Sequence, residues 1–213
     1  MFYEWTCSKI RKDDRIPADG RNVIYYFVDY YPNSVKDSDP FTRDRHEMVL
    51  NLKHLYQARG KQNYPAAQNP WYFRACVDSF IEKLTRYNYE DWLIGSIPGH
   101  AQMGSAEGNS IDKLLYFCKL GTRVTFVRSM ITRRYVVLAK HSNQGERSSK
   151  DDLDSLVIKP TLSVKYGKII VVDDITTTGS SFDGVKKALM DAGASKVLCL
   201  AMAKTKDRCN GWQ

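Results

Sequence analysis

Residues 169–203 constrain the fold of this chain more than any other stretch of its sequence. Ile169 to Val172 are four consecutive apolar residues, which is typical of a strand buried on both faces of a parallel sheet. Residues 181–192 then place apolar side chains along one helical face, and Gly193 is suited to end that helix. A second apolar strand is predicted over 197–203. This strand–helix–strand pattern predicts two parallel strands joined by a right-handed crossover.

The remainder of the chain continues the alternation of strands and helices. Apolar runs rich in β-branched and aromatic residues predict strands, and apolar residues spaced three and four apart predict helices. Several such units in succession favour the α/β class, with an open parallel sheet that carries helices on both faces. The predicted strands are 23–28, 92–97, 124–127 and 135–138, and the predicted helices are 45–56, 71–87 and 110–119, with Gly121 placed to end the last one.

Composition limits the setting in which the chain works. The formal charge of +8 fits an anionic ligand, either nucleic acid or a small polyphosphate, although a charged soluble surface explains it equally. No apolar run approaches the ~20 residues of a membrane span, and Met1 to Trp5 lack the apolar core of a signal peptide. The five cysteines lack zinc spacing, so we expect unbridged thiols and a cytoplasmic protein.

The first strand of the 169–203 unit runs into two carboxylates and a series of hydroxyl side chains. Asp173 and Asp174 come first, and residues 176–181 follow with Gly179 among them, directly before the predicted helix. The exposed N–H groups and dipole of a helix N-terminus favour an anion by about 0.3–1 kcal/mol. Threonine and serine hydroxyls add donors, and a glycine lets the backbone approach a ligand closely. The sequence therefore predicts a phosphate-binding turn.

The two aspartates point to a second part of the same ligand. Carboxylates repel phosphate, so they must face something else, and sugar hydroxyls or a hard cation such as Mg²⁺ suit them. Turn and acid pair together predict a phosphorylated sugar. The plainer alternative is that Ser180 only caps the helix, with Asp183 completing a capping box, while the acids end the strand in solvent. Capping alone does not explain two adjacent acids before three threonines.

The run Val171-Val172-Asp173-Asp174-Ile175-Thr176-Thr177-Thr178-Gly179-Ser180-Ser181 resembles the signature of the type I phosphoribosyltransferases. The resemblance implies the fold of that family, with 5-phosphoribosyl 1-pyrophosphate as ligand and Mg²⁺ as cofactor. It implies that the two aspartates are catalytic residues that contact the ribose hydroxyls and meet Mg²⁺ indirectly, through those hydroxyls or water. The residues implied for the 5′-phosphate are Thr176, Thr177, Thr178, Gly179, Ser180 and Ser181.

The same resemblance implies two further loops around the ligand. The loop after the strand at 92–97 corresponds to one that contacts pyrophosphate, and a flexible loop over 139–156 corresponds to one that closes over the site. Each basic residue of the second loop is equally explained as part of an ordinary charged loop, and Arg128, Arg133 and Arg134 either face the site or lie on a solvated strand edge. The implied residues are Pro98, Gly99 and His100 in the first loop, and Lys140, His141, Arg147 and Lys150 in the second.

Within this family the order of elements is most similar to that of the ComF-like phosphoribosyltransferases, which are associated with DNA uptake. The resemblance covers about residues 70–205 and is strong only over 165–205. Those proteins often begin with a four-cysteine zinc module, and here Cys7 stands alone. Residues 1–68 are therefore expected to be an N-terminal appendage or hood, and residues 69–213 the phosphoribosyltransferase core.

The implied reaction is transfer of ribose 5-phosphate to a nitrogenous acceptor with release of pyrophosphate. The alternative is a protein that binds the same pyrophosphate sugar without turnover, or that serves DNA uptake, in which case its positive charge would meet nucleic acid. A general nucleotide binder is disfavoured, because neither Gly-x-x-x-x-Gly-Lys-Ser/Thr nor Gly-x-Gly-x-x-Gly occurs. The family resemblance implies a homodimer, and the acceptor cannot be read from the sequence.

Overall fold

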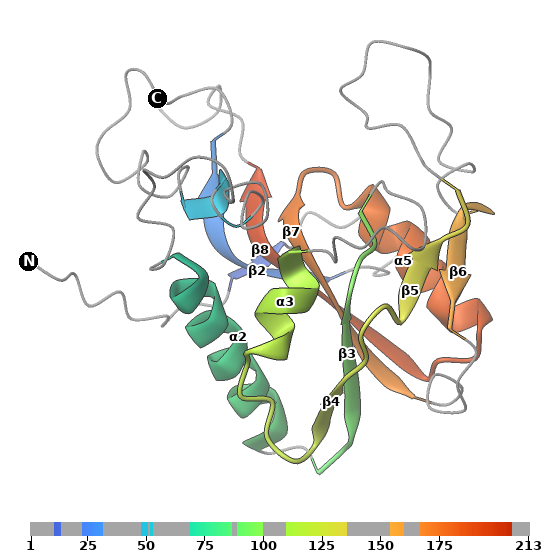
Figure 1. The fold of residues 1–213 in the computed structure, drawn as a ribbon, viewed down its shortest axis with the longest axis horizontal. Coiled ribbons are helices and arrows are strands. Elements are labelled where there is room, and N and C mark those ends of the chain that lie inside the picture. Colours follow the sequence, from blue (N-terminus) through green and yellow to red (C-terminus); the bar gives the residue numbers. More distant parts are fainter. Residues whose placement is uncertain are drawn as a thin grey trace, which may run out of the picture.

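The computed structural model of the chain describes residues 11–13, 23–31, 48–50, 52, 69–86, 89–99, 110–135, 154–159 and 167–205. In this part of the chain an open sheet carries helices on both of its faces (Figure 1). No helix among the described residues is long and apolar enough to cross a membrane.

The central sheet has six strands and confirms the predicted α/β class. Its strands β2, β8, β7, β3 and β4 run parallel to one another, and β1 pairs antiparallel with β2 at one edge. The short strand β1 was not predicted. Across the sheet the order is β1 (Arg11–Asp13), β2 (Ile24–Tyr30), β8 (Lys196–Thr205), β7 (Lys168–Thr176), β3 (Trp92–Ser96) and β4 (Val124–Phe126).

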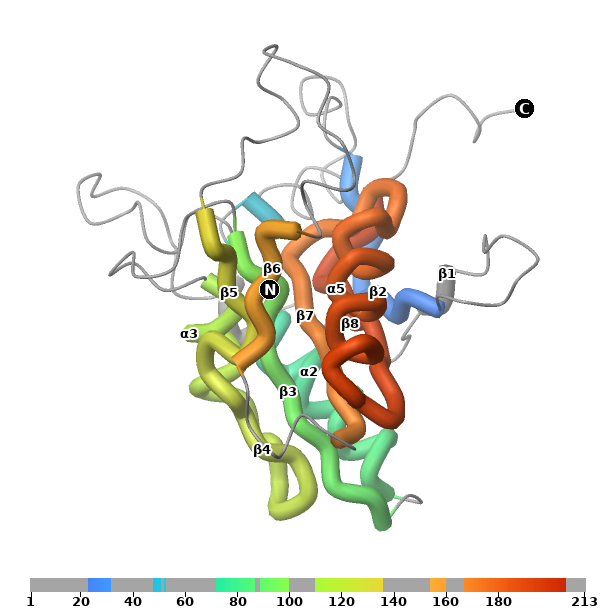
Figure 2. The backbone as a smooth tube through the Cα atoms, turned by 90° about the vertical axis from the view of Figure 1, so that its right-hand side faces the viewer, coloured from blue at the N-terminus to red at the C-terminus, as the bar shows by residue number. Residues whose placement is uncertain are grey.

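The alternation of side chains along β7 divides the core into two layers. Ile170 and Val172 pack into a cluster with the helices α2 (Asn69–Arg86) and α3 (Ser110–Tyr116). Ile169 and Val171 pack on the other face, against the helix α5 (Ser180–Asp191), which Figure 2 shows running alongside β7 and β8. A strand exposes successive side chains to opposite faces, so four apolar residues in a row require cover on both.

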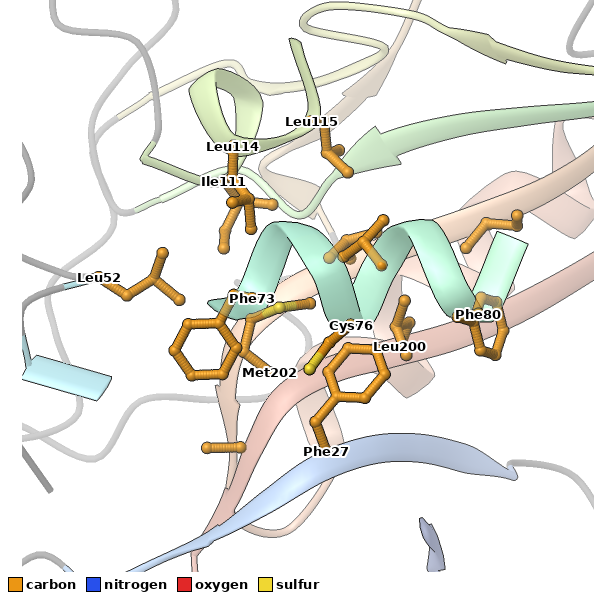
Figure 3. Packing of buried hydrophobic residues seen from close by; sticks show 14 of the residues in the cluster. Phe27, Leu52, Phe73, Cys76, Phe80, Ile111, Leu114, Leu115, Leu200 and Met202 are labelled. Carbon is orange, nitrogen blue, oxygen red and sulfur yellow. The ribbon is translucent and has the colours of Figure 1, made fainter. Parts of the chain in front are cut away.

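Helix α2 supplies much of the first layer. Its residues Phe73, Cys76 and Phe80 are at most 5% exposed, and they recur at the spacing of three and four that predicted an amphipathic helix over 71–87. Figure 3 shows these side chains between the sheet and α3. The neighbours labelled there are Phe27 from β2, Leu200 and Met202 from β8, and Ile111, Leu114 and Leu115 from α3.

A two-stranded hairpin of β5 (Ile131–Arg133) and β6 (Leu156–Ile158) packs beside α5. The strand predicted over 135–138 is wrong for Tyr135, which lies in a bend and is 42% exposed; residues 136–138 lie outside the described part. Burial alternates along β5 itself, where Ile131 and Arg133 are buried and the threonine between them is less so. The strand was not predicted, because one of its two buried residues is an arginine and the prediction relied on apolar residues.

The predicted helix end is confirmed for α5 and is wrong for α3. Gly193 has φ 96° and directly follows Ala192, the C-cap residue of α5, as predicted. Helix α3 instead ends at Tyr116, because the next N–H groups bond three residues back, Phe117 N to Leu114 O at 3.1 Å. Gly121 has φ 69° but lies beyond that end. The helix predicted over 45–56 lies mostly outside the described residues, although 48–50 and 52 are helical.

Strand β2 joins the N-terminal part of the chain to the central sheet. It pairs in parallel with β8, with Ile24 opposite Cys199 and Tyr30 opposite Thr205. Phe27 and Val28 lie in the same core layer as α2. Any division at residue 68 therefore leaves a strand of the first part inside the sheet of the second, and the proposed boundary stays a prediction.

The thiols of Cys76, Cys118 and Cys199 are not in disulfides. Burial raises the pKa of both Cys118 and Cys199 to about 12, with the nearby Asp78 carboxylate adding to the effect at Cys118. Since the thiolate is the reactive form, iodoacetamide at pH 8 is expected to leave these two residues unmodified in the native protein and to label them in urea. Peptide mass spectrometry checks this, and native labelling of Cys199 at the rate seen in urea would contradict its burial.

Candidate functional site

The direction in which the chain crosses the sheet reverses between β3 and β7. From β3 the chain continues through α3 to β4 on one side, and from β7 it continues through α5 to β8 on the other. Ligands of open α/β sheets bind outside the carboxyl ends of the strands at such a point. Ile97 N donates to Val172 O at 2.8 Å, so the segment that follows β3 starts beside the part of β7 that directly precedes the two aspartates. The segment after β3 corresponds to the pyrophosphate loop that the family resemblance implies, and the segment after β7 is the predicted phosphate-binding turn.

The acid pair lies within β7 rather than after it. The strand continues past the predicted end at residue 172, and Asp173 still pairs with Ala201 of β8. Both carboxylates are half-buried, and each turns one oxygen to the main chain: Asp173 Oδ1 accepts Asp174 N–H at 2.9 Å and Asp174 Oδ1 accepts Ile175 N–H at 2.6 Å. Strand alternation places Asp173 toward the α5 face and Asp174 toward the α2 face.

Each acid has a different neighbour on its own face. Burial lowers the pKa of the Arg133 guanidinium, and the negative charge of Asp173 acts in the opposite direction, favouring the cation. Burial raises the pKa of Tyr30, and the charge of Asp174 raises it further, so this phenol stays protonated near neutral pH. The two aspartates are therefore adjacent in sequence but differ in surroundings.

The turn between β7 and α5 contains a glycine in a left-handed conformation directly before the helix. Gly179 is the N-cap residue of α5 with φ 86° and ψ −2°, a left-handed conformation that favours glycine. The alternative in which Ser180 caps the helix is wrong, since Ser180 is the first helical residue and no side chain caps the helix. Thr178 Oγ1 instead bonds to Ser180 Oγ at 3.2 Å, which gathers exposed hydroxyls at the helix start.

A buried lysine lies under this turn, and the sequence argument missed it. Lys204 of β8 is 5% exposed, and its Nζ donates to Thr177 O at 2.6 Å. Its neighbour in register, Thr176, is 3% exposed, and Thr176 Oγ1 has no hydrogen-bond partner among the described residues. The available signal was a charged residue directly after the apolar strand predicted over 197–203, next to the strand that carries the acids.

The loop after β3 is held by a second buried cation. Arg133 is 6% exposed; its Nε donates to Gly99 O at 2.8 Å and its Nη1 to Ser155 Oγ at 2.5 Å. A solvated strand edge is therefore wrong for Arg133, whereas Arg128 and Arg134 are exposed. Pro98 and Gly99 lie where the pyrophosphate loop was predicted. The predicted residues His100, Lys140, His141, Arg147 and Lys150 lie outside the described part of the chain.

The acid pair supplies oxygen ligands only, which suits Mg²⁺. In the part of the chain that the structure describes, no group of three or more His, Cys, Asp or Glu residues could hold a metal ion by itself. Mg²⁺ usually keeps several waters and binds through one or two carboxylates together with substrate phosphates. Asp173 and Asp174 fit that role when a phosphorylated ligand completes the shell.

No protein-family model matches the sequence, and no curated protein matches it. Solved structures with a similar course of the chain include an adenine phosphoribosyltransferase at 16% identity and a TM-score of 0.40, covering 65% of this chain and 71% of that one. A hypoxanthine phosphoribosyltransferase from Staphylococcus aureus has 12% identity and a TM-score of 0.40, covering 68% and 69%. A phosphoribosyltransferase from Corynebacterium diphtheriae has 18% identity and a TM-score of 0.34, covering 75% and 89%. A functional assignment therefore depends on the site itself.

Proposed function

We propose that this protein is a phosphoribosyltransferase that binds 5-phosphoribosyl 1-pyrophosphate with Mg²⁺ and transfers ribose 5-phosphate to a nitrogenous acceptor. The observation that carries the proposal is the half-buried pair Asp173 and Asp174 in the strand that leads directly into the left-handed turn at Gly179. This arrangement lies where the chain reverses its direction across the sheet. A sugar phosphate needs both parts, one for its hydroxyls and one for its anion.

The turn from Thr176 to Ser181 would hold the 5′-phosphate. Its hydroxyl groups and the first N–H groups of α5 are donors, and the positive end of the helix dipole favours an anion there. Helix α5 runs over 12 residues and is anchored in the core by Phe182, Val185 and Leu189. The phosphate would therefore meet donors that are already oriented before it binds, which reduces the cost of binding.

The acid pair would hold the ribose hydroxyls and stabilise the positive charge that develops on the sugar. In the proposed reaction the bond from C1′ to the pyrophosphate oxygen breaks, and its electron pair leaves with pyrophosphate. A bond from the acceptor nitrogen to C1′ forms, and the proton of that nitrogen passes to solvent or a base that we do not assign. Bound Mg²⁺ would neutralise charge on the leaving pyrophosphate. Electrostatic stabilisation of this kind is commonly the largest contribution to catalysis.

The pyrophosphate would lie against the loop formed by Pro98, Gly99 and His100. Backbone N–H groups are the proposed donors in this loop, and Arg133 adds a positive charge nearby. The basic residues proposed to neutralise the leaving group from the 139–156 segment are Lys140, His141, Arg147 and Lys150. Three further parts belong to the proposal. The order of elements supports a ComF-like protein, the scattered cysteines support a cytoplasmic setting, and the family resemblance implies a homodimer.

A binding assay paired with a release assay tests the proposal. Isothermal titration with phosphoribosyl pyrophosphate and Mg²⁺ is expected to give a Kd of about 1 μM to 1 mM, the range of ordinary enzyme substrates. A coupled assay for pyrophosphate, run across a panel of nitrogenous bases, is expected to show release with at least one of them. ATP serves as the control polyphosphate. Absence of binding at millimolar ligand would contradict the proposal, and binding without release would support the non-catalytic alternative.

A further inference from the structure

Two buried cations lie beneath the candidate site, and they bond to different segments of it. Lys204 belongs to β8 and pairs in register with Thr176 of β7. Arg133 belongs to the β5–β6 hairpin, which packs in the layer of α5. Fully buried lysine and arginine side chains are rare unless they are paired. Here each one donates to a main-chain carbonyl of a segment that is proposed to bind phosphate.

The bond from Lys204 fixes the direction of one peptide in the phosphate turn. Nζ lies 2.6 Å from Thr177 O, on the side of the core. No described peptide bond is cis, and in a trans peptide the carbonyl and the following N–H point in opposite directions. The N–H of Thr178 is therefore directed away from Lys204 and out of the core. Loss of this bond would release the carbonyl to turn toward the phosphate, which would repel it.

Arg133 holds the loop after β3 through a similar bond to a main-chain carbonyl. Gly99 is exposed, and a Cβ added to it would meet nothing within 4 Å. The hydrogen bond from Arg133 therefore holds a position that is exposed. The guanidinium joins Gly99 O to Ser155 Oγ of the hairpin, and the planar fork of an arginine suits two such acceptors at once. This side chain thus links the loop after β3 to the base of the hairpin.

We propose that Lys204 and Arg133 are positioning residues that set the two halves of the ligand site separately, Lys204 the 5′-phosphate turn and Arg133 the pyrophosphate loop. The inference rests on the proposed function. Because the two cations belong to different elements and bond to different segments, each change is expected to impair one half and spare the other. A merely structural role in the core would impair both halves together.

The test uses two fragments of the ligand as probes, ribose 5-phosphate for the turn and inorganic pyrophosphate with Mg²⁺ for the loop. Lys204→Met is expected to weaken ribose 5-phosphate binding by about 10- to 100-fold, the loss of one hydrogen bond to a charged group, and to change pyrophosphate binding by less than about threefold. Arg133→Met is expected to show the reverse pattern. Each variant is the control for the other, and isothermal titration of the full chain measures all four affinities.

Conservative variants separate charge from the hydrogen bond and keep the test open if a methionine variant does not fold. Lys204→Gln keeps a donor without the charge and is expected to fall between wild type and Lys204→Met. Arg133→Lys keeps the positive charge but loses the planar guanidinium, which bonds to Gly99 O and Ser155 Oγ at once. Equal losses for both probes in either methionine variant, or no loss in either, would overturn the inference while wild-type binding upholds the proposed function. Failure of the wild type to bind either probe would overturn both.

Discussion

Replacement of both Asp173 and Asp174 by asparagine is expected to abolish measurable binding of phosphoribosyl pyrophosphate, with affinity lowered by about 100- to 10,000-fold while the fold persists. Each carboxylate would hold a ribose hydroxyl, and a hydrogen bond to a charged group contributes about 1.5–3 kcal/mol. Two such losses together amount to about 3–6 kcal/mol, and each 1.4 kcal/mol is a tenfold change in affinity. Asparagine has the shape of aspartate but lacks its charge, so it also removes the attraction to Mg²⁺.

The single variants are expected to differ, because the two acids lie on opposite faces of β7. Asp173→Asn removes the negative charge that favours the buried Arg133 cation, so it is expected to lower stability as well as affinity. Asp174→Asn is expected to act mainly on affinity. Titration calorimetry and urea unfolding measure the two effects, and Asp183→Asn, at an exposed acid in the first turn of α5, is the matched control. Unchanged affinity in the double variant would rule out the ribose contacts.

The part of the fold that the sequence predicts best is the part determined by neighbours along the chain. The apolar run from Ile169, the amphipathic face of α5 and the glycine after it are local signals, and the β7–α5–β8 unit follows them closely. The turn before α5 is also predicted from local sequence, because a glycine and hydroxyl residues at a helix start are recognisable without any distant contact. The strand was predicted from its apolar run, which ends at Val172, yet pairing with β8 extends it to Thr176.

What the sequence does not predict depends on partners far away along the chain. Lys204 reaches a carbonyl 27 residues back, and Arg133 reaches one 34 residues back. A lysine or arginine is normally assigned to the surface, and only the folded chain provides the acceptors that allow it to be buried. The hairpin of β5 and β6 was missed for the same reason, because its two strands are short and its inward residues include a charge.

Gly179→Val is expected to lower the affinity for phosphoribosyl pyrophosphate by more than about 100-fold and to destabilise the fold by about 2–3 kcal/mol, the cost of a side chain held in a sparsely populated backbone conformation. Gly179 has φ 86°, and an added Cβ would lie 2.8 Å from Ile24 Cδ1. The end of an isoleucine side chain can shift, so the backbone conformation accounts for most of the cost. A β-branched residue relieves that strain only if the turn leaves its left-handed conformation, which would move the N–H groups that face the phosphate.

Gly121→Val is the control that separates the cost of backbone strain from the loss of ligand binding. Gly121 also has a left-handed φ, 69°, but an added Cβ would meet nothing within 4 Å, and the residue lies between α3 and β4, away from the phosphate turn. A similar loss of stability, again about 2–3 kcal/mol, is expected there with affinity unchanged. Urea unfolding and titration of both variants make the comparison. If the two valine variants lost stability alike and both kept wild-type affinity, the left-handed turn at Gly179 would be a feature of the fold alone, and the phosphate would have to bind elsewhere.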